Sequence, residues 1–278
     1  TAIGKSGGRQ RLPLTILASL LCCAPALAQQ APAGPPDTSK IALRGFGDAR
    51  LRFEKVRSDL PGGDEDALTL RVQSGAELQF SGATSLLVEV EGVADIYRDE
   101  PGGGLSGPVV IPDRESLEIN RAQLSHDFGP ARVIGGRQRL SFDDERFVGT
   151  VGFRQNEQTY DAVRITNSPI KRVAIDVVYL WQVNRFLSTR EATASFEGDT
   201  YLVNVGIDTP AGRLTGYHYT LDLDDGAGAP FSQVNSSVTS GASLVGRRYW
   251  KDVGVGWRAE YARQSDYAGN PLDYSADY

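Results

Sequence analysis

The chain has 278 residues, of which 40% are hydrophobic and 23% charged, and its 35 acidic residues outnumber its 29 basic ones. Without Lys5, Arg9 and Arg11, which precede an apolar stretch at the amino end, 26 basic residues face 35 acidic ones and the net charge falls to -9. This acidic balance argues against a general nucleic-acid binder.

The amino end has the form of an export signal. An apolar stretch from Leu12 to Leu27 follows the basic residues, and Ala26-Leu27-Ala28 is a small-x-small cleavage site. Prolines and hydroxyl residues interrupt the stretch, which makes it a poor spanning helix. We therefore expect residues 1–28 to be a signal peptide, and the Pro- and Ala-rich residues 29–40 to be a disordered leader.

Both cysteines, Cys22 and Cys23, fall inside this signal. The rest of the chain therefore has no thiol for a disulfide, a metal site or a nucleophile. A lipoprotein anchor at one of the cysteines is the alternative, but Ser19-Leu20-Leu21 before them lacks the small residue that such signals carry.

From Ile41 onward the sequence alternates between apolar and polar residues with a period of two, which is typical of β-strands. The first run places Ile41, Leu43, Ala49, Leu51 and Phe53 on one face and Arg44, Asp48, Arg50, Arg52 and Glu54 on the other. Runs at 68–80 and 86–96 repeat the pattern. Strands of about 9 to 11 residues or more fit a tilted crossing of a bilayer.

Further alternating runs occupy residues 117–128, 132–140, 159–166, 173–183, 201–207, 213–221, 238–245 and 253–264. Short turns alternate with long polar connections between them, as in outer-membrane barrels. We predict an all-β fold, an antiparallel transmembrane β-barrel in the bacterial outer membrane, with roughly 11–12 strands over residues 41–278. The alternative is a secreted β-sandwich, which has shorter strands and a polar outward face.

The carboxyl end is short for a barrel strand. Only seven residues follow Pro271, and about eleven strands is an odd number where single-chain bacterial barrels have an even one. We therefore expect the barrel to be truncated at this end.

The sequence offers little for catalysis. His126 and His218 stand alone, outside any metal-ligand or nucleophile-elbow pattern. The acidic run Asp222–Gly226 lacks the glutamate that closes a calcium loop. We predict no enzyme, no catalytic residue, no cofactor and no metal site.

The densest polar block is GGRQRLSFDDERFVGTVGFRQNEQTYD, from Gly135 to Asp161. Such a block is too polar for lipid and, in a barrel, belongs in the lumen or at its mouth. Extended by AVRI, it resembles the signature segment of the alginate-export family of outer-membrane porins. That resemblance implies a single-chain barrel that passes anionic polysaccharide such as alginate, or smaller acidic or sugar solutes, through an arginine-lined constriction.

The resemblance also implies roles for residues in the block. Arg137, Arg139, Arg146 and Arg154, together with Gln138, Gln155 and Asn156, would line the pore, and Asp143, Asp144 and Glu145 would position the arginines or gate passage.

Strand alternation independently places Arg44, Arg50, Arg52 and Arg71 on the lumen face, where they would extend the row of pore-lining arginines. Structural pairing with acids of neighbouring strands, such as Glu77, Glu89 and Glu91, is the alternative.

The expected partners are outer-membrane lipid, the solutes, periplasmic chaperones and the barrel-assembly machinery, and no nucleic acid. Two rival functions remain: a secreted β-sandwich that binds or degrades polysaccharide, and a structural barrel with a plugged lumen.

Overall fold

The computed structural model describes residues 41–57, 64–80, 82–99, 111–187, 194–224 and 232–278. The expected signal peptide and leader, residues 1–40, and the last two residues of the acidic run, 225 and 226, lie outside the described residues.

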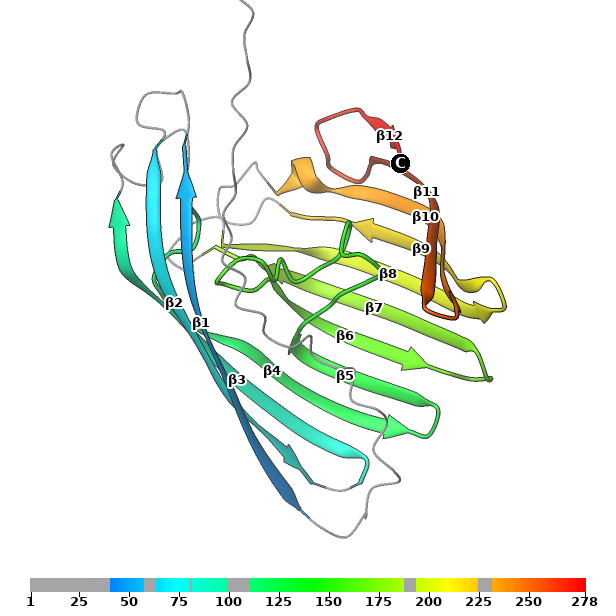
Figure 1. The fold of residues 1–278 in the computed structure, drawn as a ribbon, viewed down its shortest axis with the longest axis horizontal. Coiled ribbons are helices and arrows are strands. Elements are labelled where there is room, and N and C mark those ends of the chain that lie inside the picture. The colour runs from blue at the N-terminus through cyan, green and yellow to red at the C-terminus, as the bar shows by residue number, and fades with distance from the viewer. Residues whose placement is uncertain (1–40, 58–63, 81, 100–110, 188–193, 225–231) are drawn as a thin grey trace, which may run out of the picture.

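The described residues form one curved sheet of twelve strands in chain order, and each strand is antiparallel to its neighbours (Figure 1). The strands are β1 (Ala42–Val56), β2 (Glu65–Gln79), β3 (Thr84–Asp99), β4 (Ser116–Phe128), β5 (Ala131–Gln138), β6 (Thr159–Asn167), β7 (Val173–Asn184), β8 (Ser195–Thr209), β9 (Gly212–Leu221), β10 (Ser237–Trp250), β11 (Val253–Asp266) and β12 (Ser275–Asp277), with a 3-10 helix at Gln233–Asn235. The predicted all-β barrel fold is confirmed. No pairing joins β12 to β1 within the described ranges.

Several strands are longer than the sequence pattern predicted. β8 begins at Ser195 instead of near residue 201, and β10 continues to Trp250 instead of ending near residue 245. The extra residues, SFEGDT at 195–200 and GRRYW at 246–250, break the alternation of apolar and polar residues, yet the antiparallel ladder with their neighbours continues through them.

Along β1 and β2 the sheet is polar on its concave face and apolar on its convex face. On β2, Thr69, Arg71 and Gln73 are buried, whereas Val72 is 47% exposed. On β1, Leu51 and Phe53 are exposed. A soluble domain buries its apolar face, so this inversion requires an apolar solvent around the convex face, which a bilayer supplies. One continuous sheet of this kind is not a β-sandwich, in which two sheets bury apolar faces against each other.

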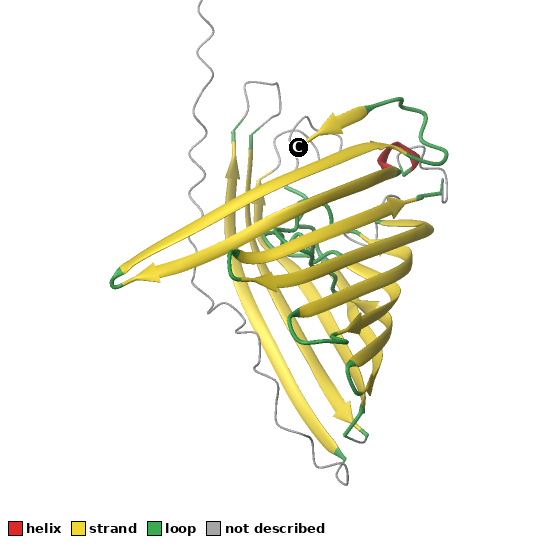
Figure 2. Cartoon of the chain, turned by 90° about the vertical axis from the view of Figure 1, so that its right-hand side faces the viewer, coloured by secondary structure: helices red, strands yellow, loops and turns green. Residues whose placement is uncertain are grey.

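The connections alternate in length as the sequence predicted. Short turns join β4 to β5 at Gly129-Pro130, β8 to β9 at Pro210-Ala211 and β10 to β11 at Lys251-Asp252, and they lie along one rim of the sheet (Figure 2). Long connections leave the opposite rim. In bacterial outer-membrane barrels the short turns face the periplasm.

Candidate functional site

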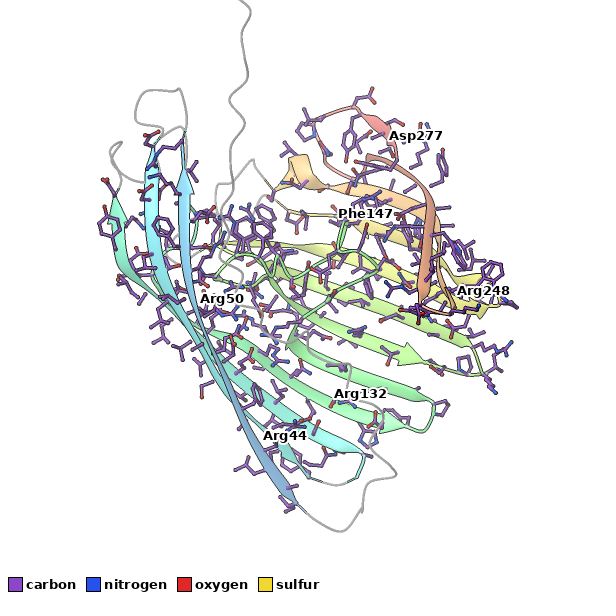
Figure 3. All side chains as sticks on the ribbon, viewed as in Figure 1. Arg44, Arg50, Arg132, Phe147, Arg248 and Asp277 are labelled. Carbon is purple, nitrogen blue, oxygen red and sulfur yellow. The ribbon has the colours of Figure 1, made fainter. Side chains whose placement is uncertain are left out.

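One long connection turns into the barrel. The chain leaves β5 after Gln138, crosses the concave side of the sheet and returns at Thr159 to begin β6 (Figures 1 and 3). We call residues 139–158 the inward segment. Its contacts reach from β1–β3 on one wall to β8–β11 on the other, so it spans the lumen.

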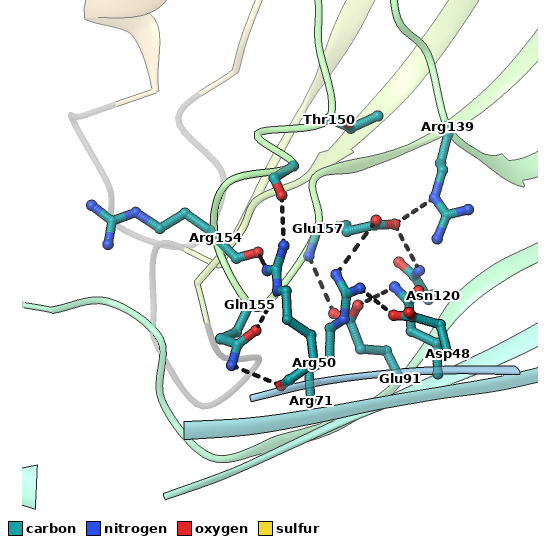
Figure 4. A network of polar contacts seen from close by, with 12 residues as sticks. Asp48, Arg50, Arg71, Glu91, Asn120, Arg139, Thr150, Arg154, Gln155 and Glu157 are labelled. Atoms are coloured by element: carbon teal, nitrogen blue, oxygen red, sulfur yellow. Dashed lines mark hydrogen bonds and ion pairs between the residues drawn. The ribbon is translucent and has the colours of Figure 1, made fainter. Parts of the chain in front are cut away.

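On the first wall the inward segment is held by directed polar contacts, which we call the polar anchor (Figure 4). The Nε of Arg50 on β1 donates to Oε1 of Gln155 at 2.8 Å, and the same guanidinium donates to the carbonyl oxygens of Gly152, at 2.8 Å, and Arg154. Gln155 is fully buried and donates to the Thr69 hydroxyl at 2.8 Å. A buried amide and guanidinium that satisfy each other fix the backbone at a defined position.

A row of ion pairs continues the polar anchor. Arg154 donates to Glu54 at 3.1 Å. Glu157 accepts from Arg139, which also donates to Glu89 at 3.0 Å. Arg121 makes a bidentate contact with Glu89 at 3.0 and 2.6 Å. The Arg154–Glu54 and Arg139–Glu89 pairs join the inward segment to the wall by charge as well as by hydrogen bonds, whereas Arg121–Glu89 links two wall strands.

A β-bulge adds a further donor to this row. Val90 pairs with Ile119 and Glu89 with Arg121, so Asn120 is the extra residue on β4. Its amide donates to Glu89 at 2.7 Å and to Glu157 at 3.1 Å. Bulges commonly re-aim a side chain in this way.

On the second wall the inward segment is held by stacked rings, which we call the aromatic anchor. Phe142 stacks on Tyr219 with 5.8 Å between ring centroids, and Tyr219 stacks on Tyr217 at 5.1 Å. Phe147 packs against Tyr217 at 5.9 Å and meets Tyr278 edge-on at 5.5 Å. Phe142, Tyr217 and Tyr219 are buried and belong to the hydrophobic core on the concave face. This core exists because the inward segment covers part of the wall.

Between the two anchors the inward segment is braced internally. The Glu145 carboxylate accepts from the Ser141 hydroxyl at 2.5 Å and from the Thr150 amide at 3.2 Å. Asp143, Glu145 and Val151 adopt left-handed backbone conformations, with φ of 53°, 61° and 53°. Such conformations persist in residues other than glycine only where surrounding contacts hold them, and they are common at functional sites.

A cavity of about 820 Å³ lies between the inward segment and the wall on the short-turn side. Its lining is mixed. The apolar side chains are Phe142, Ala174, Ile175 and Val245, and the polar and charged ones include Ser141, Asp143, Arg164, Thr166, Asn167, Asp176, Asn204, Arg213, Thr215 and Arg258. Three arginines and two aspartates therefore face one space, together with several amide and hydroxyl groups.

Each cavity arginine has an acidic partner. Arg258 lies 2.9 Å from Asp144 and 2.8 Å from Glu260, Arg164 pairs with Asp176, and Arg213 lies 3.0 Å from Asp208. Such pairs hold the guanidinium groups in place while leaving some of their donors directed at the cavity.

Asp143 is exposed to the cavity but is surrounded by protein on its other sides. Partial burial raises the pKa of the Asp143 carboxyl, and repulsion from Glu260 and Asp144 adds to the rise, while a hydrogen bond from Asn204 opposes it. The Asp143 carboxyl on the cavity wall therefore takes up a proton more readily than an ordinary Asp.

The structure divides the predicted site residues into groups. Arg50, Arg52, Arg139, Arg154, Gln155 and Asn156 gather at the polar anchor, and Asp143, Asp144 and Arg146 lie on the cavity side of the inward segment. The remaining three stand apart. Arg137 makes a bidentate pair with Asp161 of β6 at 2.8 and 3.0 Å, and Gln138 is buried and donates to the Ala162 carbonyl. Arg44 lies towards the short-turn end of β1 (Figure 3).

Sequence reasoning missed the cavity arginines and the aromatic anchor. Arg213 and Arg258 lie on strands far from the polar block in sequence, and Arg164 follows the block by three residues, inside the AVRI extension, but was not singled out. The run GYHYTL at Gly216–Leu221 did carry a signal, because Tyr217 and Tyr219 alternate with His218 and so share one face. Asp113 accepts a hydrogen bond from the backbone N–H of Gln155 at 2.9 Å. It lies in a long connection, where the alternation of apolar and polar residues gives no information.

Two features are absent from the part of the chain that the structure describes. There is no group of three or more His, Cys, Asp or Glu residues arranged to hold a metal ion. No helix in the same ranges is long and apolar enough to cross a membrane.

Residues 46–268 match the family model for alginate export. That match covers more than half of the chain and includes the whole inward segment. No curated protein matches the chain.

Solved outer-membrane porins share the fold. The chain is similar to OccAB4 of Acinetobacter baumannii (TM-score 0.64, 12% identity, 87% of this chain and 63% of that one). It is also similar to OccD3 of Pseudomonas aeruginosa (TM-score 0.57, 10% identity, 84% and 50%). A third is OccK2 of Pseudomonas aeruginosa, solved in complex with glucuronate (TM-score 0.55, 12% identity, 84% and 58%). The chain thus spans between 50% and 63% of the length of these porins.

Proposed function

The chain belongs to the alginate export family, and on this premise we propose that it forms an outer-membrane channel whose lumen is narrowed by the inward segment. The family and the porin fold place the chain in the bacterial outer membrane. They are the family and fold of transport proteins, and we propose transport without catalysis.

The observation that carries this proposal is the segment across the lumen with a charged cavity beside it. A segment held on both walls leaves a solute only the space around it, and the 820 Å³ cavity is part of that space. Channels pass solutes efficiently when several weak sites replace one tight site. Arginines that are already paired with acids supply weak sites of this kind.

We further propose that the solutes are small hydroxylated acids or anionic sugars. The cavity presents guanidinium groups suited to carboxylates and amide or hydroxyl groups suited to sugar hydroxyls. OccK2, with a similar fold, was solved with glucuronate, a molecule of this class. Alginate is the polymeric member of the class that the family's description suggests.

Planar-bilayer recording tests the proposal. We expect the folded full chain to conduct ions and to prefer anions, and the double variant R146Q/R258Q to lower the anion-to-cation permeability ratio. The matched control is K55Q/R57Q, which removes the same charge at the long-loop end of β1, where both residues pair with Asp66. A selectivity that changes equally in both variants would contradict a role for the cavity.

A plugged structural barrel is the second candidate, and the firm attachment of the inward segment to both walls favours it. The two functions separate in liposome swelling. A channel admits neutral and acidic monosaccharides and swells the vesicles, whereas a folded, heat-resistant barrel that causes no swelling is a plug.

A further inference from the structure

The short turn between β10 and β11 carries basic side chains that lack acidic partners. Arg247, Arg248 and Lys251 form no ion pair in the described ranges, although Asp252 follows directly in the chain. At other short turns Arg213 pairs with Asp208 at 3.0 Å and Arg132 with Asp127 at 3.4 Å, whereas Lys171 and Arg172 between β6 and β7 also form no ion pair within the described ranges. The turn is a cationic spot on an acidic protein.

The same turn exposes large apolar side chains. Trp250 is 81% exposed, Tyr249 66% and Val253 62%. No hydrogen bond is made by the Trp250 indole to any described residue. The ring of an exposed Trp gains free energy when it leaves water, whereas its N–H still needs a hydrogen-bond acceptor. Water alone does not meet both needs.

Strand register places Arg248 and Trp250 on the convex face. Val245 lines the cavity inside the lumen, and side chains alternate along β10, so even-numbered positions beyond it point outwards. Arg248 lies opposite Val255 and Trp250 opposite Val253 on β11, and both valines are exposed on the apolar face. The two side chains therefore leave the barrel at the point where its apolar surface ends, near the rim seen at Arg248 in Figure 3.

The charge and the position of the β10–β11 turn together favour a lipid headgroup as its ligand. A Trp ring prefers the level of the lipid headgroups, and the long stem of Arg can lie along the apolar surface while its guanidinium reaches the phosphate level. Unpaired basic residues next to a bilayer attract anionic lipids. By the same alternation Arg247 shares the lumen face with Val245, which leaves Arg248 and Lys251 as the cations at the bilayer surface.

We propose that the β10–β11 turn binds the headgroups of anionic phospholipids in the periplasmic leaflet of the outer membrane. Arg248 and Lys251 contact the phosphate, and the Trp250 ring lies beside the ester region. This site fixes the depth of the β10–β11 hairpin in the bilayer. It is separate from the lumen and holds whether or not the barrel conducts.

Local quenching of Trp250 tests the site directly. The full chain carrying W181F and W257F keeps Trp250 as its only Trp and is folded into phosphatidylcholine vesicles that contain a minor fraction of phosphatidylglycerol. Either lipid is supplied with brominated acyl chains, which quench a nearby indole. We expect quenching by brominated phosphatidylglycerol to exceed that by brominated phosphatidylcholine at equal mole fraction. In the R248Q/K251Q variant we expect the apparent affinity for phosphatidylglycerol to fall roughly fivefold for each cation removed.

Controls separate local binding from misfolding. K55Q/R57Q removes two charges at the opposite rim and should leave the preference unchanged. In case R248Q/K251Q folds poorly, raising the salt concentration on the single-Trp chain should abolish the preference without any substitution. Equal quenching by both lipids in the single-Trp chain would overturn the proposal. Absence of quenching by either lipid would overturn it too, and would assign the turn to water or to a protein surface.

Discussion

The two anchors of the inward segment hold it on the barrel wall by different interactions. At the polar anchor, Arg50 and Gln155 hold the backbone through hydrogen bonds with defined directions. At the aromatic anchor, Phe142 and Phe147 are held by ring packing against Tyr217 and Tyr219. Directed bonds fix a position and are lost together when one partner is removed, whereas packed rings tolerate small shifts but depend on buried area.

This difference suggests a division of roles. The polar anchor sets where the inward segment lies in the lumen, and the aromatic anchor supplies most of its stability. Substitutions at the two ends should therefore have distinguishable effects on unfolding and on conductance.

The largest effect is expected from F142A. Removing this buried ring deletes its stack on Tyr219 and leaves a cavity, which should lower the free energy of unfolding by about 3 kcal/mol. Denaturant unfolding of the chain in lipid vesicles measures the loss. F153A is the matched control, because Phe153 lies on the same segment but is 65% exposed. Equal losses in both variants would mean that the aromatic anchor adds no special stability.

A smaller loss of stability and a clearer change in conductance are expected from R50M. The substitution strands the buried Oε1 of Gln155 and two carbonyl oxygens, at a cost of about 2 kcal/mol. Because the segment is then free at its polar end, we expect a noisier single-channel current. The control variant R44M makes the same substitution six residues away on β1. If its single-channel current were as noisy as that of R50M, the noise could not be assigned to loss of the polar anchor.

The middle of the segment should respond less. A Cβ at position 149 would lie 2.5 Å from the Cβ of Glu145, so G149A should displace the Glu145 brace and lower the free energy of unfolding by about 1 kcal/mol. In G152A the nearest contact is the Thr150 hydroxyl at 3.4 Å, and we expect almost no change. If G149A were as stable as the parent chain, the brace between the anchors would have no measurable role.

The smallest effect concerns pH. Burial raises the pKa of Asp143 in the folded chain above its unfolded value. The ionised carboxylate therefore disfavours folding, and stability rises as the pH falls through the folded pKa towards the ordinary Asp value near 4. Neutralising this acid also makes the cavity wall more positive. Reversal potentials should show a stronger anion preference below neutral pH, and D143N should lack that part of the pH response.

The alternating pattern was sufficient to predict the sheet. Leu51 and Phe53 oppose Arg50 and Arg52 in the sequence, and because side chains of a strand alternate strictly, the two faces were readable before any fold was known. The short and long connections followed from composition, since turns and loops carry Gly, Pro and polar residues. The polar block was assigned to the lumen or its mouth because lipid cannot solvate it.

The tertiary structure decided which residues meet there. Arg154 lies 100 positions from Glu54 and Phe142 lies 77 from Tyr219, and no local pattern encodes such separations. Sequence alone could not distinguish Arg139, which joins the polar anchor, from Arg137 two residues earlier, which pairs with Asp161 on the next strand. Periodicity is a property of one strand, whereas an ion pair or a ring stack depends on how strands and the inward segment are placed in space.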